Sequence, residues 1–397
     1  MLQQTGRIGR GPSFSGSNME PMLQGCMVLD YTGRMGWLAG RLLADLGAEV
    51  TKFEAQGADV SSADWRALNV NKRLVRVDPA DPDGRRALDQ YAATADILIA
   101  TPATADEADL YDYARLSAVN KRLIVVAITP FGLTGPKTGW QATDIEIMAA
   151  GGAMALAGEP DGAPLRVSAT QSYAWAGSQA AVGALMALAA RWRTGRGQRV
   201  VVSAQSAVIT ALSHAPTFVD MLGITPTRAG AYMTGRSVTG AKYRVFWPCR
   251  DGYINFIVYG GAAGRRTNEQ LVAWMRERGF DLGPLGDIDW ARFTPTGASQ
   301  AEVDSMELPI GRFIGSLTKR EFLEEAHRRE MLGYPVSNTA DIAADPQLEA
   351  RGFWQDLPGP DGTERHCGCF VVVDGVRPPL VRPADDTGKI RRQARET

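Results

Sequence analysis

The alternation of strand and helix is clearest in residues 26–54, which read CMVLDYTGRMGWLAGRLLADLGAEVTKFE. The short apolar run at 26–30 predicts a buried strand. The helical spacing of Leu38, Leu42 and Leu46 predicts a helix over 36–46, and Gly47 is typical of a residue that ends a helix. Residues 48–54 predict the next strand.

The same order of elements continues toward residue 129. Strands are expected at 74–77, 96–100 and 123–129, and helices at 82–93 and 110–118. Strands that alternate with helices imply a parallel sheet covered by helices on both faces. The predicted fold class is therefore α/β. A long helix rich in Ala, Gly and Leu follows at 173–193, and its small residues indicate that it is buried.

The character of the chain changes near residue 225, after which Gly, Thr and aromatic residues dominate. A hairpin is expected from strands at 242–248 and 253–259, joined by Cys249-Arg250-Asp251-Gly252. This change indicates a second, smaller α+β domain. We therefore expect four segments: a flexible leader at 1–24, the N-terminal part of a large domain at 25–224, a small domain at 225–335 and a C-terminal return to the large domain at 336–397.

The composition argues against several classes of protein. The chain has 43 basic and 44 acidic residues, a net charge of −1, whereas proteins that bind nucleic acids or membrane surfaces normally carry a basic excess. It has no apolar run of about 18 residues, and its first 25 residues lack the apolar segment of a secretory signal. We expect a cytoplasmic protein with no membrane and no nucleic-acid partner.

Two short motifs resemble parts of a metal site and of a dinucleotide-binding site, but neither has the spacing that such a site needs. His366-Cys367-Gly368-Cys369 has a narrower spacing than zinc ligands usually need. Gly33-Arg34-Met35-Gly36 follows the first strand but lacks the glycine spacing that brings backbone close to a pyrophosphate. We expect neither a metal nor NAD.

A long segment without acidic residues lies in the centre of the chain. No Asp or Glu occurs between Asp161 and Asp220. Within this segment PLRVSATQSY (164–173) leads into the Ala-rich helix, and RTGRGQ (193–198) follows the helix. Further motifs stand in order along the chain: AGRLLADLGAEVTKFE (39–54), NVNKR (69–73), DPDGR (81–85), PFGLTGP (130–136) and DPQLEARGF (345–353).

Taken in this order, the segments resemble the family III CoA-transferases, the CaiB/BaiF-like superfamily. The resemblance implies a Rossmann-like large domain, a small domain, and two ring-like subunits that interlock as a dimer. It also implies an active site between the large domain of one subunit and the small domain of the other. The substrates are then an acyl-CoA and a carboxylic acid, so coenzyme A is the expected cofactor.

The family nucleophile is an Asp that attacks a thioester to form a mixed anhydride and then carries CoA as an enzyme thioester. Counted back without gaps from the turn at 194–198, the position of this Asp holds Tyr173. A phenol would give an aryl ester and cannot form both intermediates. The resemblance therefore implies no catalytic residue in this chain. Asp144 is interpreted as structural. Racemase chemistry is also unsupported, because Thr143 stands where related racemases have a His.

The contacts with CoA that the resemblance implies are partly lost. Ala55 stands where a basic residue is common, and Thr101-Pro102 where an Asn-Phe pair is common. Asn71 and Lys72, in Asn71-Lys72-Arg73, are retained as candidate CoA contacts. Lys72 is either a phosphate contact or a solvated surface lysine, and Lys137 is a weaker candidate. Two glycine-bearing loops are candidates for shielding an acyl intermediate. The first contains Gly235 and Gly240, and the second contains Gly260 and Gly261, for which a plain hairpin connection is the alternative.

The leading hypothesis is a non-nucleophilic subunit of a heteromeric family III CoA-transferase, whose partner is a paralogue that supplies the catalytic Asp. Heteromeric members such as benzylsuccinate CoA-transferase are similar in having one such subunit. Two alternatives remain open. One is a CoA-thioester-binding pseudoenzyme that acts as a sensor or scaffold. The other is an isomerase or lyase of the same superfamily that uses Asp144, Glu146 or Tyr173.

Overall fold

The computed structural model describes residues 20–78, 81–235 and 237–384, so most of the leader predicted at 1–24 lies outside the described residues. The described residues form two compact units. The first contains the described residues of 20–153, 166–217 and 346–384, and the second contains those of 154–165 and 218–345. The sequence predicts a small domain at 225–335, whereas the second unit runs from 218 to 345 and also includes residues 154–165.

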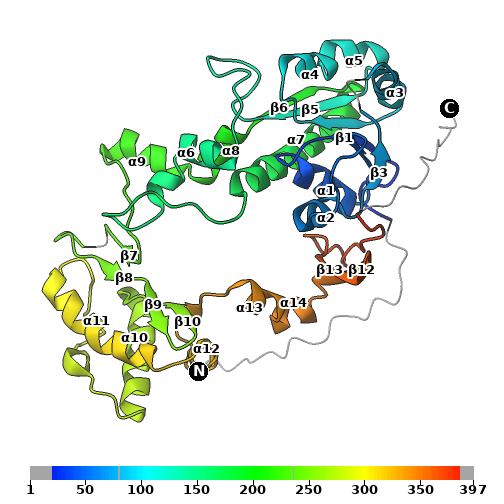
Figure 1. Cartoon of the computed structure of the whole chain (residues 1–397). Helices are drawn as coiled ribbons and strands as arrows, with labels where there is room; N and C mark the ends of the chain where they lie inside the picture. Colours follow the sequence, from blue (N-terminus) through cyan, green and yellow to red (C-terminus); the bar gives the residue numbers. More distant parts are fainter. Residues whose placement is uncertain (1–19, 79–80, 236, 385–397) are drawn as a thin grey trace. The chain divides into compact units, whose positions relative to one another are not determined.

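The first unit is built on a six-stranded parallel sheet with the strand order β3-β2-β1-β4-β5-β6, the order of the doubly wound Rossmann fold (Figure 1). The central strands β4 and β5 are buried along their whole length, because helices cover both faces. The α/β prediction is thus confirmed. The strands are β1 (Met27–Tyr31), β2 (Glu49–Glu54), β3 (Arg73–Arg76), β4 (Ile97–Ala100), β5 (Ile124–Thr129) and β6 (Arg199–Ser203).

The helices of this unit follow the strands as the sequence predicted, with short additional helices. They are α1 (Trp37–Asp45), α2 (Ala63–Asn69), α3 (Pro82–Ala92), α4 (Ala105–Leu110), α5 (Tyr113–Val119), α6 (Asp144–Ala150), α7 (Gln171–Thr194) and α8 (Ala204–Ala211). Helix α9 (His214–Leu222) crosses the boundary between the two units. The 3-10 turns η1 (Met154–Leu156) and η2 (Gly283–Gly286) belong to the second unit.

Helix α7 packs closely against α1 because its inner face is made of small residues. A Cβ added at Gly177 would lie 3.0 Å from the Cβ of Leu38 and 3.2 Å from the backbone nitrogen of Ala39. The helix ends at Gly195, whose φ of 70° suits glycine. The prediction that α7 is buried holds for this face only, since Met186 and Trp192 on its other side are 68% and 78% exposed.

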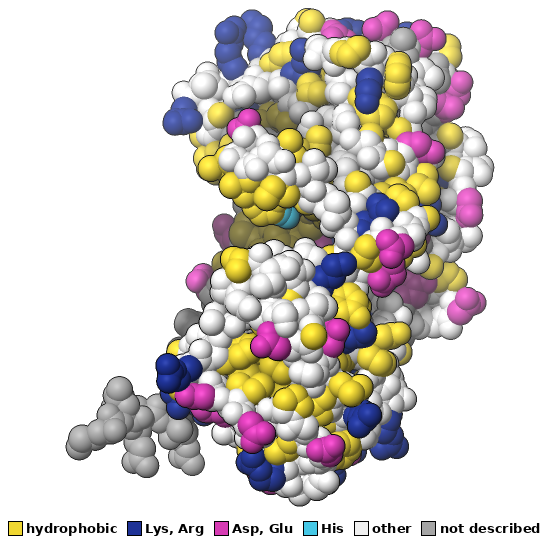
Figure 2. Space-filling view, turned by 90° about the vertical axis from the view of Figure 1, so that its left-hand side faces the viewer, with side chains coloured by type: hydrophobic (Ala, Val, Ile, Leu, Met, Phe, Trp, Pro, Cys, Tyr) yellow, Lys and Arg dark blue, Asp and Glu magenta, His cyan; other side chains and the backbone are white. Residues whose placement is uncertain are grey.

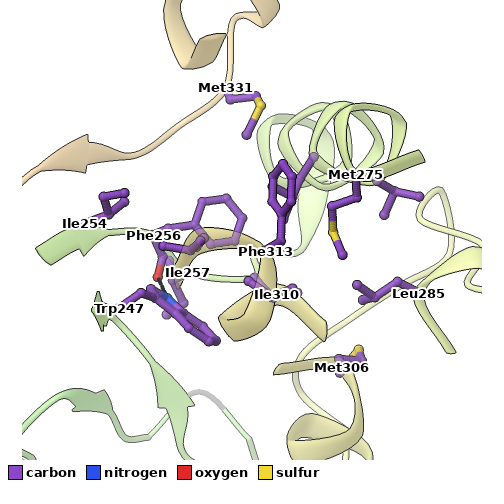
Figure 3. Close-up of a cluster of buried hydrophobic side chains, with 14 of the residues drawn as sticks. Trp247, Ile254, Phe256, Ile257, Met275, Leu285, Met306, Ile310, Phe313 and Met331 are labelled. Carbon is purple, nitrogen blue, oxygen red and sulfur yellow. Dashed lines mark hydrogen bonds between the residues drawn. The ribbon is translucent and has the colours of Figure 1, made fainter. Parts of the chain in front are cut away.

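The second unit has the α+β character that the sequence predicted. Its antiparallel sheet has the order β11-β10-β9, and the hairpin of β9 and β10 is shorter than expected, because residues 256–258 leave the sheet to enter the core. Figure 3 shows this core, in which Trp247, Phe256 and Phe313 are buried. The elements are β7 (Tyr232–Met233), β8 (Tyr243–Arg244), β9 (Phe246–Cys249), β10 (Gly252–Asn255), α10 (Gly261–Glu277), α11 (Gln300–Gly315), α12 (Lys319–Arg329) and β11 (Tyr334–Pro335).

The C-terminal segment from residue 346 belongs to the first unit. Arg66 on α2 donates from Nε to Glu364 Oε1 at 2.6 Å, and the Asn71 backbone N–H donates to the Arg382 carbonyl at 2.9 Å. These bonds join residues about 300 positions apart in sequence. The elements of the segment and the linker before it are α13 (Thr339–Ala343), α14 (Pro346–Ala350), β12 (Trp354–Gly359) and β13 (Gly362–Cys367).

On the face shown in Figure 2, basic and acidic side chains are interspersed rather than gathered into regions of one sign. Among the described residues, no helix is both long enough and apolar enough to span a membrane.

Candidate active site

The carboxyl ends of β1 and β4 form the switch point of the large sheet, where α/β proteins usually bind their ligands. The chain leaves β1 toward β2 and β3 and later returns to β4 on the other side of β1. The loops after the two strands touch, since the Gly33 backbone N–H donates to Thr101 Oγ1 at 2.5 Å. Thr101 therefore holds the two loops together at this edge.

Helices α6 and α7 are joined at their N-termini by the carboxylate of Asp144. Its Oδ1 accepts hydrogen bonds from Ser172 Oγ at 2.7 Å and from the Ser172 backbone N–H at 2.9 Å. Asp144 is 6% exposed and Ser172 is fully buried. Glu146 is occupied separately, because it forms a capping box with Thr143, and these hydrogen bonds lower the pKa of its carboxyl. Asp144 thus joins α6 to α7, and Glu146 caps the N-terminus of α6.

Tyr173 lies beside this pair as the third residue of α7 and is half-buried. Burial raises the pKa of its phenol, and the negative charge of Asp144 raises it further. The Asp144 backbone and Arg34 act in the opposite direction and do not reverse the shift. Tyr173 is therefore a neutral phenol near pH 7. It can take part in hydrogen bonds but has no carboxylate with which to carry an acyl group.

Lys72 and Asn71 are not placed to contact a phosphate, which corrects the sequence prediction. The ammonium of Lys72 donates to Asp30 Oδ2 at 2.8 Å, to the Trp37 carbonyl at 2.7 Å and to Asn69 Oδ1 at 2.8 Å. Its three donors are thus used, and the side chain is 1% exposed. Burial, partly offset by Asp30, lowers the pKa of Lys72 to about 8. The alternative of a solvated surface lysine is wrong for the same reason.

Asn71 has a structural role next to this lysine. Its φ is 71°, in the left-handed region that Asn tolerates better than most residues. The side chain donates to the Ala44 carbonyl at 3.2 Å and accepts from the Val381 backbone N–H at 2.9 Å. Asn71 therefore fixes the C-terminal segment to α1.

Lys137, the weaker sequence candidate, lines a cavity of about 310 Å³. The loops after β4 and β5 form much of its wall, near the sheet edge described above. The Lys137 ammonium lies 5.2 Å from the ring centre of Phe131 and 6.0 Å from that of Trp140. Aromatic faces and a cation together suit a planar base that carries phosphate groups. Sequence reasoning missed Trp140, because one exposed Trp in a Gly-rich loop has no recognisable pattern.

The two glycine-bearing loops rest on one segment of the second unit, residues 293–298, here called the support segment. Thr239 Oγ1 donates to the Ala298 carbonyl at 2.6 Å, and the Val238 backbone N–H donates to the Thr296 carbonyl at 2.9 Å. On the second loop, a Cβ at Gly260 would lie 2.6 Å from Pro295 Cδ. The structure thus brings together two loops that the sequence could only treat separately.

The glycines of these loops have different local roles. Gly235 and Gly240 have φ values of 76° and 81°, which only glycine adopts easily. Gly260 is the N-cap of α10, and Gly261, its first residue, also has a positive φ of 73°. The alternative of a plain hairpin connection for the second loop is therefore wrong. Among the described residues, no group of three or more His, Cys, Asp and Glu side chains is arranged to hold a metal.

The fold is that of an α/β protein with a cavity of about 310 Å³ near the carboxyl edge of its sheet. The model of CoA-transferase family III matches residues 23–388. The chain is 32% identical over 346 residues to the succinyl-CoA:(R)-benzylsuccinate CoA-transferase subunit BbsE of Thauera aromatica, an alignment that covers 83% of this chain and 82% of that protein. The chain therefore belongs to CoA-transferase family III.

Two further comparisons agree with this assignment. The chain is 28% identical over 388 residues to the succinate–glutarate CoA-transferase of Agrobacterium fabrum, with 92% of this chain and 90% of that protein covered. The crystal structure of a CAIB/BAIF family protein from Brucella suis superposes with a TM-score of 0.76 at 25% identity, covering 92% of this chain and 96% of that one. Enzymes of this family use CoA thioesters as substrates.

Proposed function

We propose that this chain is the non-nucleophilic subunit of a heteromeric family III CoA-transferase, which moves CoA between a thioester and a carboxylic acid. A paralogous partner supplies the catalytic Asp. The observation that carries the proposal is the neutral phenol of Tyr173 in the first turn of α7, within a stretch that has no acidic residue from 162 to 219. In this proposal the chain keeps the family fold and lacks the nucleophile.

The nearest carboxylates do not replace the missing one. Asp144 receives two hydrogen bonds from Ser172, and Glu146 is held by Thr143. A nucleophile or general base needs an oxygen that can approach the substrate, and Asp144 is only 6% exposed. Its burial and its hydrogen bonds with Ser172 weigh against a transferase, isomerase or lyase that uses Asp144, and the lowered pKa of Glu146 makes that carboxylate a weak base.

The relatives support a heteromer. The Thauera aromatica relative is itself named as a subunit of its transferase. In the proposed assembly the two chains interlock, and this chain contributes its glycine-bearing loops at 234–240 and 260–261 to the partner's active site. Such a role explains how a chain without the nucleophile is retained.

The cavity beside Lys137 is proposed to bind the nucleotide end of CoA. Phe131 and Trp140 offer faces on which an adenine can stack, and the Lys137 ammonium can pair with a phosphate. This cavity also favours a second candidate, a homodimeric CoA-thioester sensor. Tight CoA binding by a homodimer that stays inactive when the paralogue is added would favour the sensor.

The test is a transfer assay on this chain, on its Asp-bearing paralogue and on the two co-expressed. CoA transfer is expected only from the co-expressed pair, and native mass spectrometry is expected to show a stable 1:1 or 2:2 complex. Replacing the partner's nucleophilic Asp by Ala should abolish transfer, whereas Tyr173→Phe in this chain should not. Transfer by this chain alone at ordinary enzymatic rates would overturn the proposal.

A further inference from the structure

A cavity of about 400 Å³ lies in the second unit, and the support segment forms part of its wall. Phe293, Thr294, Gly297 and Ala298 belong to this segment, which the two glycine-bearing loops contact. The cavity and the loops therefore share one structural element. The remaining lining residues come from η2 and its surroundings and from α11: Pro284, Ile288, Glu302, Ser305 and Met306.

The lining is mostly apolar. It contains one charged residue, Glu302, and among the described lining residues there is no Lys or Arg. The Glu302 carboxylate is the capping group of α11, since its Oε2 accepts from the Ser299 backbone N–H at 2.8 Å and from Ser299 Oγ at 2.7 Å. These bonds lower the pKa of Glu302, so it is ionised near pH 7. An anionic ligand would meet this charge without a compensating cation.

Size and chemistry together select the ligand. A cavity of about 150 Å³ lined by apolar side chains is large enough to hold benzene, so this one has room for a ring and a short chain. An anionic group would lie against the ionised Glu302 carboxylate with no cation among the lining residues that the structure describes. An uncharged, apolar group avoids this repulsion and gains from the burial of its surface.

We propose that this cavity binds the uncharged, ring-sized apolar end of an acyl or acid substrate and so selects substrates that carry such an end. The role in selection rests on the proposed function, whereas binding to the cavity does not. Because the support segment also accepts hydrogen bonds from residues 237–239 of the first glycine-bearing loop, a bound group would hold these residues in place.

The binding arm uses two probes with the same ring and different charge, benzyl alcohol and benzoate, titrated calorimetrically into the full chain. Benzyl alcohol is expected to bind at least tenfold more tightly than benzoate. Gly297→Leu should abolish this binding, because a Cβ at Gly297 meets no atom within 4 Å and the added side chain fills the cavity. Gly315→Leu is the matched control, since its Cβ also meets nothing within 4 Å and it lies outside the cavity.

Ser305→Leu fills the cavity from α11 instead of from the support segment, and it gives a second test should Gly297→Leu fail to fold. Loss of benzyl alcohol binding in either folded variant supports the site. No binding of benzyl alcohol to the wild type, equal binding of benzoate, or unchanged binding in a folded cavity-filling variant would each overturn the proposal.

The selection arm uses the co-expressed complex with phenylacetate and acetate as alternative acceptors. Ser305→Leu, which lies outside the support segment, should raise KM for phenylacetate at least tenfold and leave KM for acetate unchanged. An equal change in both would overturn the role in selection. A complex that transfers CoA to no acid at all would instead contradict the proposed function, while the result of the binding arm would stand.

Discussion

Ser172→Ala tests whether Asp144 is a structural carboxylate that joins α6 to α7. The variant removes the 2.7 Å hydrogen bond from Ser172 Oγ and keeps the 2.9 Å bond from the backbone N–H. Both residues are buried, so water does not replace the lost donor. A hydrogen bond to a charged group contributes about 1.5–3 kcal/mol, and the free energy of unfolding should fall by about this amount.

Ser178→Ala is the matched control for this measurement. Ser178 lies on the same helix, and its hydroxyl bonds only to the Ala174 carbonyl, at 2.8 Å. The difference in helix propensity between Ser and Ala is common to both variants and cancels in the comparison. Urea unfolding at pH 7, followed by far-ultraviolet circular dichroism, should separate the two midpoints. Equal midpoints would refute the structural role of Asp144 and would make it a candidate nucleophile or general base again.

Three other predictions concern buried ionisable groups and the cavity beside Lys137 that is proposed to bind CoA. Lys72→Met should lower the free energy of unfolding by about 3–5 kcal/mol, because it leaves the buried charge of Asp30 without its partner; a change below about 1 kcal/mol in urea unfolding would contradict the buried pair. Lys137→Ala should leave the unfolding midpoint unchanged and weaken CoA binding roughly tenfold by calorimetry, and unaltered affinity would remove Lys137 from the site. Burial raises the pKa of Glu307 from 4.5 to about 7, so the folded state holds a proton that the unfolded state releases, and stability falls as pH rises from 4.5 to 7. Glu307→Gln should therefore raise Tm at pH 8 and leave it unchanged at pH 5, whereas the surface control Glu324→Gln should show no such pH dependence.

The sheet could be predicted because its strands are short apolar runs separated by helices with regular apolar spacing. Residues 26–54 alone contain a strand, a helix and a strand, and the structure has β1, α1 and β2 there. Local pattern is sufficient in this region because each element buries a face that its own sequence marks. The register and the crossing from β3 to β4 involve residues far apart in sequence, and no local pattern specifies them.

The site was predicted less well, because the deciding contacts are long-range. The motif Asn71-Lys72-Arg73 shows a basic residue but not its burial, which depends on Asp30, 42 positions away. The support segment reads as an ordinary Thr- and Pro-containing loop. Its contact with Thr239 spans 59 positions. The absence of an acidic residue between 161 and 220, by contrast, can be read directly from the order of residues in the sequence.

The most direct test of the central claim is intact-mass spectrometry of the separated subunits after the complex has reacted with an acyl-CoA and been denatured at low pH. A carboxylate nucleophile becomes a covalent thioester of CoA, which adds the mass of CoA minus water to the chain that bears it. We predict this mass increase on the Asp-bearing partner and none on the chain with Tyr173. The same increase on this chain, localised to Asp144 or any other carboxylate, would contradict the account.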